Sequence, residues 1–157
     1  MTPTKTIHNL PTELIWMVAE NLDPVSRMHL RESCTDMNNR IFPPTHKELV
    51  EFESTPYGYE SGLFACANYI QLLPKEMFAD NMTVHKRAKR RSGSIIRFCL
   101  ECGTHPVQSR PRYTAGDHII VQGKMFMICT RCGNFKEGKE KKGKGQSECL
   151  ECWESSL

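Results

Sequence analysis

Residues 99–103 read Cys-Leu-Glu-Cys-Gly, and residues 129–133 read Cys-Thr-Arg-Cys-Gly. Each stretch follows a short apolar run, at 95–98 and at 125–128, and separates its two cysteines by two residues. Cysteines at this spacing reach one ion from a tight turn, in which the glycine adopts a left-handed backbone conformation. Because zinc prefers four soft ligands in a tetrahedron, the two pairs together predict one structural zinc in a ribbon-like module. The predicted ligands are Cys99, Cys102, Cys129 and Cys132.

Four further cysteines leave the question of a second zinc open. A second site would take the third pair, Cys149 and Cys152, together with Cys66 and a histidine. A crossed arrangement is also compatible with the spacing, in which the first pair shares an ion with the third and the second pair joins Cys66. If neither site forms, Cys149 and Cys152 remain as two thiols near Trp153. The candidate histidines are His85, His105 and His118.

The chain context favours metal ligation over disulfides. The chain has 157 residues, and its first ten lack the apolar segment of a secretory signal. No apolar run approaches the ~18 residues of a membrane-spanning helix. We therefore expect the protein in the cytoplasm or nucleus, where cysteines are more often metal ligands than disulfides. A redox dithiol and an iron–sulfur cluster are the competing interpretations, and no strand–helix–strand pattern surrounds either pair to support the dithiol.

Nothing in the sequence indicates catalysis. It contains no glycine-rich phosphate loop, no His-Glu-x-x-His motif and no Ser–His–Asp pattern. Four cysteine ligands would also fill the coordination of the predicted zinc and leave no position for an activated water. The sequence therefore predicts a binding protein and not an enzyme.

Three short helices are expected before residue 42. Pro11 fits the first turn of the first helix, and Asp23-Pro24 is typical of the start of the second, with Asp23 as its N-cap. Thr35 or Asp36 would cap the third, while Cys34 is expected to be a small core residue. The apolar positions that recur at helical spacing on the first helix are Leu14, Ile15, Val18 and Leu22.

The C-terminal part is expected to be β structure. His118–Val121 and Lys124–Ile128 are β-prone runs on either side of Gln122-Gly123, a typical hairpin turn. Lys136–Ser147 is rich in lysine and glycine and predicts a loop. The expected fold class is thus small α+β, with three helices followed by a zinc-stabilised module. The expected domains are 1–46 (helical), 47–94 (a partly helical linker with a basic stretch) and 95–157 (zinc module).

Charge divides the chain in a similar way. Residues 1–84 carry 6 Lys+Arg and 11 Asp+Glu, a net charge of −5, whereas residues 85–157 carry 15 and 7, a net charge of +8. Lys86–Arg91 is the densest basic run and predicts a solvated, flexible link. Its alternative interpretation is a nuclear-localisation or phosphate-contacting patch.

Residues 7–41 resemble an F-box, a small helical docking motif. The resemblance is carried by Leu10-Pro11-Thr12-Glu13-Leu14-Ile15, then Val18, Leu22-Asp23-Pro24 and Leu30-Arg31 with Cys34. The rest of the chain resembles a group of fungal F-box-like proteins with a cysteine-rich C-terminal part. That second resemblance is carried by Leu63-Phe64-Ala65-Cys66, by Leu72–Asp80 and by Arg97–Gly103.

The resemblance implies a substrate receptor of a Skp–cullin–F-box ubiquitin ligase. The helices would bind a Skp-type adaptor, which joins them to a cullin, and the zinc module would bind a protein substrate that the sequence does not identify. The alternative is a zinc-ribbon nucleic-acid-binding protein, favoured by the basic half but not by its scarcity of interleaved aromatic residues. The adaptor contacts implied by the resemblance are Leu10, Pro11, Leu14, Ile15, Val18 and Leu22.

Overall fold

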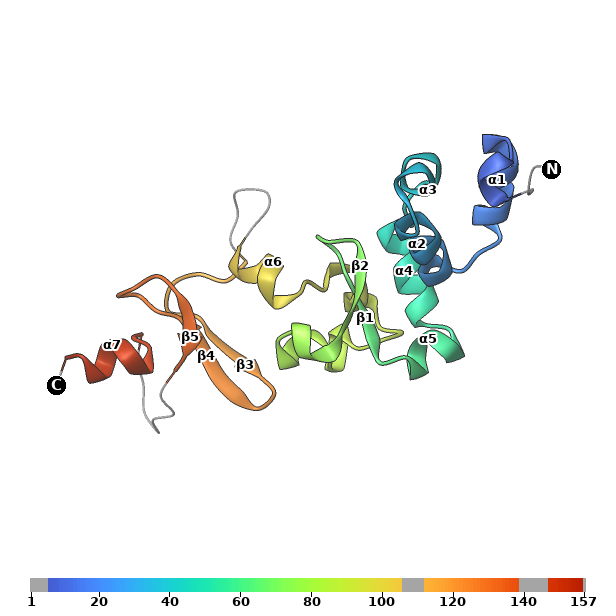
Figure 1. Cartoon of the computed structure of the whole chain (residues 1–157). Helices are drawn as coiled ribbons and strands as arrows, with labels where there is room; N and C mark the ends of the chain where they lie inside the picture. Colours follow the sequence, from blue (N-terminus) through green and yellow to red (C-terminus); the bar gives the residue numbers. More distant parts are fainter. Residues whose placement is uncertain (1–5, 106–111, 139–146, 157) are drawn as a thin grey trace.

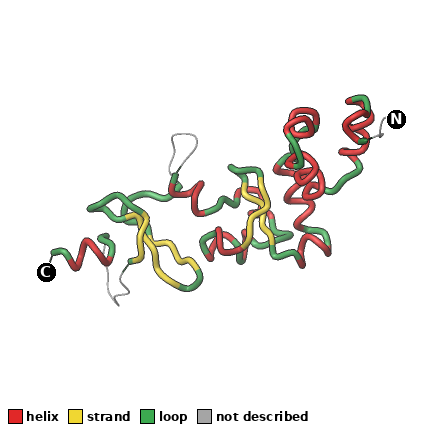
Figure 2. The backbone as a smooth tube through the Cα atoms, in the orientation of Figure 1, coloured by secondary structure: helices red, strands yellow, loops and turns green. Residues whose placement is uncertain are grey.

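The computed structural model describes residues 6–105, 112–138 and 147–156. The molecule is elongated, with the N-terminal helices at one end and α7 at the other (Figure 1). Its fold is small α+β, as predicted, because helices dominate the first half and two small antiparallel sheets follow (Figure 2).

The α-helices are α1 (Thr12–Glu20), α2 (Pro24–Glu32), α3 (Thr35–Arg40), α4 (His46–Glu53), α5 (Pro56–Glu60), α6 (Leu100–Thr104) and α7 (Leu150–Glu154). The strands are β1 (Leu63–Cys66), β2 (Gln71–Pro74), β3 (His118–Val121), β4 (Lys124–Ile128) and β5 (Phe135–Glu137). Short 3₁₀ helices are η1 (Ile7–Asn9), η2 (Lys75–Met77), η3 (Asp80–Met82), η4 (His85–Arg87) and η5 (Ser92–Ile96).

The three N-terminal helices form where the sequence predicts them. Asp23 caps α2 as expected, because its carboxylate accepts hydrogen bonds of 3.0 and 3.1 Å from the first two free N–H groups of the helix. The cap of α3 differs from the prediction of Thr35 or Asp36. The Cys34 Sγ accepts a 3.5 Å hydrogen bond from the Met37 N–H, so Cys34 is a half-buried cap that also packs against the helical core, as predicted in part.

The helical unit has a small core of its own. The Arg40 guanidinium donates a 2.6 Å hydrogen bond to the Leu10 carbonyl, and the Trp16 indole donates to the Arg40 carbonyl at 2.6 Å. A buried apolar side chain contributes about 1.5–3 kcal/mol, which is small against the entropy of ordering three helices. We infer that the unit is marginal by itself. Its buried residues are Ile15, Ala19, Met37 and Ile41.

Residues 47–94, expected as a partly helical linker with a basic stretch, contain most of α4 and all of α5, and they also carry the β1–β2 sheet. A capping box starts α4, since the Thr45 hydroxyl accepts from the Glu48 N–H at 3.3 Å and the Glu48 carboxylate accepts from the Thr45 N–H at 2.7 Å. Leu49 and Phe52 of this helix are buried, and α4 packs against β1. The sequence did not predict β1 and β2, because strands of four residues without β-branched side chains differ little in composition from loops or helices.

The β3–β4 hairpin matches its prediction residue for residue. Gln122 and Gly123 form its turn with φ angles of 51° and 75°, the backbone that a two-residue hairpin requires. Asp80 holds this turn from outside the sheet, because its carboxylate accepts hydrogen bonds of 2.8 and 2.9 Å from the N–H groups of Gln122 and Gly123. The hairpin is thereby tied to η3.

Strand β5 was not predicted. Phe135 pairs with Ile128 on the free edge of β4, and its ring stacks on Phe126 at a centroid distance of 5.3 Å. The start of the predicted Lys136–Ser147 loop therefore belongs to the sheet. Residues 139–146 of that loop lie outside the described residues.

The largest buried cluster of the described residues crosses the expected boundary between residues 94 and 95. It joins side chains of β1, η3, α6 and β3, so the middle segment and the cysteine-rich part share one core. Three of its members are cysteines, which places a candidate metal centre inside that core. The members are Cys66, Phe78, Ala79, Met82, Phe98, Cys99, Cys102 and Ile119.

Candidate metal centres

Seven of the eight cysteines form two clusters. Within each cluster the Sγ atoms all lie within 4.8 Å of one another. We name the first the Cys66 centre (Cys66, Cys99 and Cys102) and the second the Cys129 centre (Cys129, Cys132, Cys149 and Cys152). The eighth cysteine, Cys34, caps α3.

The predicted pairing of the cysteines was therefore wrong. The single site expected from Cys99, Cys102, Cys129 and Cys132 does not form, because these two pairs belong to different centres. The crossed arrangement is not observed either. Spacing identifies the ligands but not their partners, and the pairs at 99 and 149 start helices whereas a ribbon needs hairpin turns. None of the candidate histidines His85, His105 and His118 belongs to a cluster.

The Cys129 centre joins a turn to the start of a helix. The turn follows β4 and closes with Gly133 at a φ of 72°, as its glycine predicts, and the Gly133 N–H donates to the Cys129 carbonyl at 2.8 Å. Cys149 lies at the N-cap of α7, and its N–H donates to the Cys129 Sγ at 3.2 Å. The Arg131 N–H donates to the same sulfur at 3.4 Å. Backbone geometry thus holds the cysteines together.

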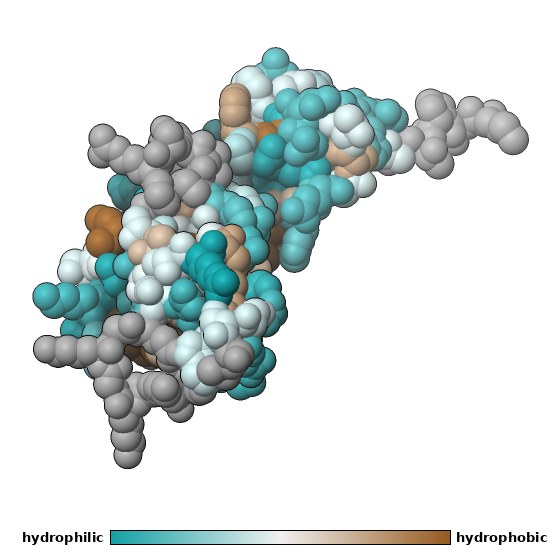
Figure 3. All heavy atoms as spheres, turned by 90° about the vertical axis from the view of Figure 1, so that its left-hand side faces the viewer, coloured by the Kyte–Doolittle hydropathy of each residue, from teal (hydrophilic) through white to brown (hydrophobic). Residues whose placement is uncertain are grey.

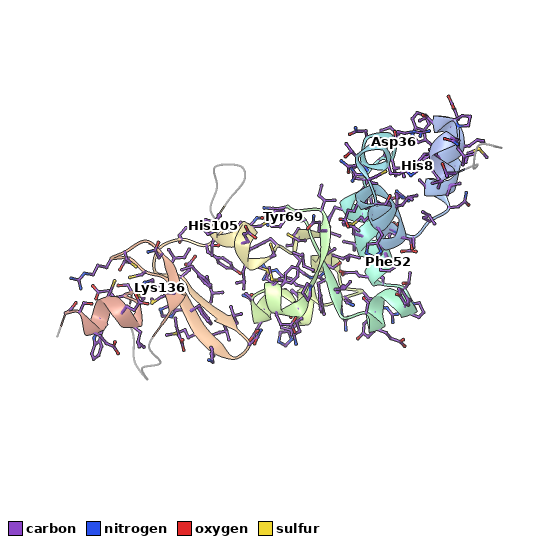
Figure 4. The ribbon with its side chains drawn as sticks, viewed as in Figure 1. His8, Asp36, Phe52, Tyr69, His105 and Lys136 are labelled. Carbon is purple, nitrogen blue, oxygen red and sulfur yellow. The ribbon has the colours of Figure 1, made fainter. Side chains whose placement is uncertain are left out.

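The Cys66 centre lies deeper in the molecule. Cys66 ends β1, while Cys99 and Cys102 occupy the N-cap and first turn of α6, and all three are buried. The Cys66 Sγ lies 3.8 Å from the Cys102 Sγ and accepts a 3.3 Å hydrogen bond from the Cys99 N–H. Figure 4 shows Tyr69, in the turn between β1 and β2, beside α6.

Both centres have the chemistry and dimensions of a thiolate site for zinc. A Zn–S bond of about 2.3 Å in a tetrahedron places neighbouring sulfurs about 3.8 Å apart. The separations of 3.8 Å between Cys66 and Cys102 and 4.0 Å between Cys132 and Cys149 agree with that value. The chain therefore carries a four-cysteine and a three-cysteine cluster that suit metal ions, most naturally zinc.

Hydrogen bonds to sulfur favour the thiolate form of one cysteine in each centre. Burial raises the pKa of Cys129, but backbone N–H donors outweigh it and lower this pKa to about 6. A hydrogen bond from the Cys99 thiol lowers the pKa of Cys66, and the same hydrogen bond raises the pKa of Cys99. One sulfur per centre is thus prepared to bind a cation without first losing a proton.

A buried ion pair supports the Cys66 centre, and sequence reasoning missed it. Glu53 and Arg97 are both 0% exposed, and the Arg97 Nη1 lies 2.8 Å from the Glu53 Oε2. The Glu53 carboxylate also accepts from the Ala65 N–H at 2.7 Å, and the Arg97 carbonyl accepts from the Ala67 N–H at 2.8 Å. The residues before and after Cys66 are therefore fixed by the pair.

The basic run Lys86–Arg91 is part of the fold and not a flexible link. Lys89 is buried, and its ammonium group donates to the carbonyls of Gly58 and Tyr59 at 2.7 and 3.0 Å. Burial lowers the pKa of Lys89. Arg90 donates to the Ser54 carbonyl at 2.9 Å. Lys89 is thus used inside the protein, whereas Lys86, Arg90 and Arg91 are exposed, so the run offers fewer free cations to a nucleic acid than its sequence suggests.

Replacing Lys89 with alanine should lower the free energy of unfolding by about 1–3 kcal/mol, because two carbonyl acceptors would lose their donor. The exposed Lys86 provides the matched control, and Lys86→Ala should change stability by no more than about 0.5 kcal/mol. Urea denaturation of both variants measures the difference. Equal effects of the two substitutions would contradict the structural role of Lys89.

The predicted adaptor contacts divide into exposed and buried residues. Leu10, Leu14 and Val18 are 36, 44 and 41% exposed, and Pro11 is exposed at the start of α1. Ile15 is fully buried, so it holds α1 to the helical core and contacts no partner in this arrangement. Leu22 is half-buried. Met17, which the sequence analysis did not name, is 60% exposed on the same helix.

In the part of the chain that the structure describes, no helix combines the length and the apolarity that crossing a bilayer requires. The chain matches no protein-family description, no curated protein and no solved structure.

Proposed function

We propose that this protein is a substrate-receptor subunit of an F-box-type ubiquitin ligase. Helix α1 docks a Skp-type adaptor, which joins the chain to a cullin, and the cysteine-rich half recruits a protein substrate. The observation that carries the proposal is the exposed apolar face of α1, beginning just before the helix. We name it the α1 face, and its residues are Leu10, Leu14, Met17 and Val18.

The α1 face has the form of a helical docking surface. Leu14, Met17 and Val18 follow the i, i+3, i+4 spacing that groups side chains on one side of a helix. The other side of the helix already packs on α3 through Ile15 and Ala19. A row of large apolar side chains left in solvent beside such a small core is typical of a surface that a partner covers.

The cysteine-rich half is placed to act independently of the adaptor. It lies at the far end of the elongated molecule from α1 (Figure 1). Its outer end is mostly hydrophilic, with hydrophobic residues in small separate patches (Figure 3). Four thiolates complete the coordination of a zinc at the Cys129 centre, which gives that centre a structural role.

Replacing Leu14 or Met17 with aspartate should weaken binding to a purified Skp-type adaptor by at least about 30-fold, the loss expected when a central interface residue is disrupted. Zinc content should not change, because α1 makes no contact with either metal centre. Isothermal titration with the adaptor and elemental analysis measure the two properties.

Ile95→Asp provides the matched control. Ile95 is 59% exposed and lies on η5, so the same change of side chain there should leave adaptor affinity unaltered. If both α1 variants bind the adaptor as tightly as the wild type, the F-box assignment fails. If the wild type itself shows no adaptor binding, the proposal also fails.

A further inference from the structure

The two metal centres are built on the same plan. Each consists of a turn that follows a strand, β1 or β4, and of a Cys-x-x-Cys pair at the start of a short helix, α6 or α7. Both helical pairs have the same sequence, Cys-Leu-Glu-Cys, at 99–102 and at 149–152. Cys66 thus corresponds to Cys129, Cys99 to Cys149 and Cys102 to Cys152.

The backbone hydrogen bonds of the two centres match in three places. The N–H of Ile70 donates to the Cys66 carbonyl at 2.9 Å, as that of Gly133 donates to the Cys129 carbonyl at 2.8 Å. Ile70 and Gly133 also share a positive φ, of 52° and 72°. The Ala67 N–H donates to the Arg97 carbonyl at 2.8 Å, and the Thr130 N–H donates to the Ser147 carbonyl at 2.9 Å. In each centre the donor follows the turn cysteine, and the acceptor lies two residues before the helical pair. The N–H of the first helical cysteine donates to the turn sulfur at 3.3 and 3.2 Å.

This correspondence identifies residue 69 as the missing fourth ligand position. Cys132 lies three residues after Cys129, and the residue three after Cys66 is Tyr69. Tyrosine is not among the usual protein ligands of zinc, which are cysteine, histidine, aspartate and glutamate. Among the described residues, no histidine, cysteine, aspartate or glutamate joins the Cys66 centre as a fourth ligand. Outside the described ranges, Glu140 is the one residue with a side chain of these types.

The fourth ligand position of the Cys66 centre lies on the side of residue 69 in this correspondence. In the Cys129 centre, the corner that corresponds to it is filled by Cys132, which is the exposed member of that cluster. Tyr69 is itself 42% exposed, whereas the three cysteines of its own centre are buried. The correspondence therefore places the fourth position of the Cys66 centre on its most exposed side.

We propose that the Cys66 centre binds zinc through three thiolates and takes its fourth ligand from solution. Zinc requires four ligands, and a site with three protein ligands holds water or another donor at the fourth. Because the other three ligands are sulfur, the position suits a single soft donor, and a monothiol binds there as its thiolate, releasing its proton to solvent and displacing the water. The Cys129 centre, with four cysteines, accepts no such ligand.

Cobalt substitution of the full chain tests this directly, because Co²⁺ takes the place of zinc in such sites and its absorption reports the ligands around it. Adding 2-mercaptoethanol should change the spectrum of the wild type until one added thiol is bound per chain. Tyr69→Cys should abolish this response, since the new cysteine occupies the fourth position. Tyr69→Phe is the matched control and should respond as the wild type does, because the phenol is not a ligand.

Zinc release to a chromogenic chelator gives a second readout. The wild type should release its two ions in two phases, with one at least about tenfold faster, since even second-shell changes alter zinc affinity by 10–100-fold. Tyr69→Cys should slow the fast phase. A wild type that binds only one metal, or a spectrum unmoved by thiol, would overturn the proposal. So would a response that persists unchanged in Tyr69→Cys.

Discussion

Replacing Cys149 with serine is expected to remove one zinc per chain and to unfold the β3–β4–β5 sheet together with α7. Cys149 is buried, and its Sγ lies 4.0 Å from the Cys132 Sγ. The described residues of the sheet bury few large apolar side chains, chiefly Ile119 and Met127. Metal binding must therefore supply much of the stability of this part. Structural zinc contributes on the order of 10 kcal/mol in small modules, so the loss should be nearly complete.

Elemental analysis and limited proteolysis measure this result. The variant should contain one zinc per chain where the wild type contains two, and cleavage should concentrate after residue 112. Cys34→Ser is the matched control, because Cys34 belongs to neither centre and a serine hydroxyl also caps a helix. A Cys149→Ser protein with full zinc content and unaltered protease resistance would show that the Cys129 centre holds no metal.

Replacing Glu53 with alanine is expected to lower the free energy of unfolding by about 3–5 kcal/mol, the cost of leaving one member of a buried ion pair without its partner. Arg97 would keep its charge at 0% exposure, and the Ala65 N–H would lose its acceptor. Because Ala65 and Arg97 lie beside the ligands Cys66 and Cys99, zinc at the Cys66 centre should also be released faster.

Glu51→Ala is the matched control, because it removes a carboxylate from the same helix without breaking a buried ion pair. Glu51 is 64% exposed and lies 3.8 Å from Lys47, so this pair should contribute no more than about 1 kcal/mol. Chemical denaturation of both variants, with zinc present in excess, gives the comparison. Equal stability losses would mean that the Glu53–Arg97 pair has no special role.

The parts of the fold that the sequence predicted are those set by neighbouring residues. The β3–β4 hairpin was predicted from two β-prone runs and a Gln-Gly turn, and these signals lie within eleven residues, 118–128. The start of α2 was predicted because Asp23 and Pro24 determine it locally. Local chemistry of this kind does not depend on the rest of the molecule.

The parts that the sequence did not predict depend on distant pairs. Glu53 and Arg97 are 44 residues apart, and nothing near either residue indicates that it is buried with the other. The partners of each cysteine pair were not predicted either, because every Cys-x-x-Cys spacing suits a tetrahedron equally well. One signal does distinguish them. The identical Cys-Leu-Glu-Cys sequences at 99 and 149 mark both pairs as the helical half of a centre.

The order of the ligands along the chain affects how the protein is loaded with metal during synthesis. The described ligands of the Cys66 centre all precede residue 103, and those of the Cys129 centre all follow residue 128. On the ribosome, Cys66, Cys99 and Cys102 emerge before any ligand of the second centre. The nascent chain can therefore close its first centre while the later thiols are still untranslated. An ion taken up early then meets no competing cysteine from downstream.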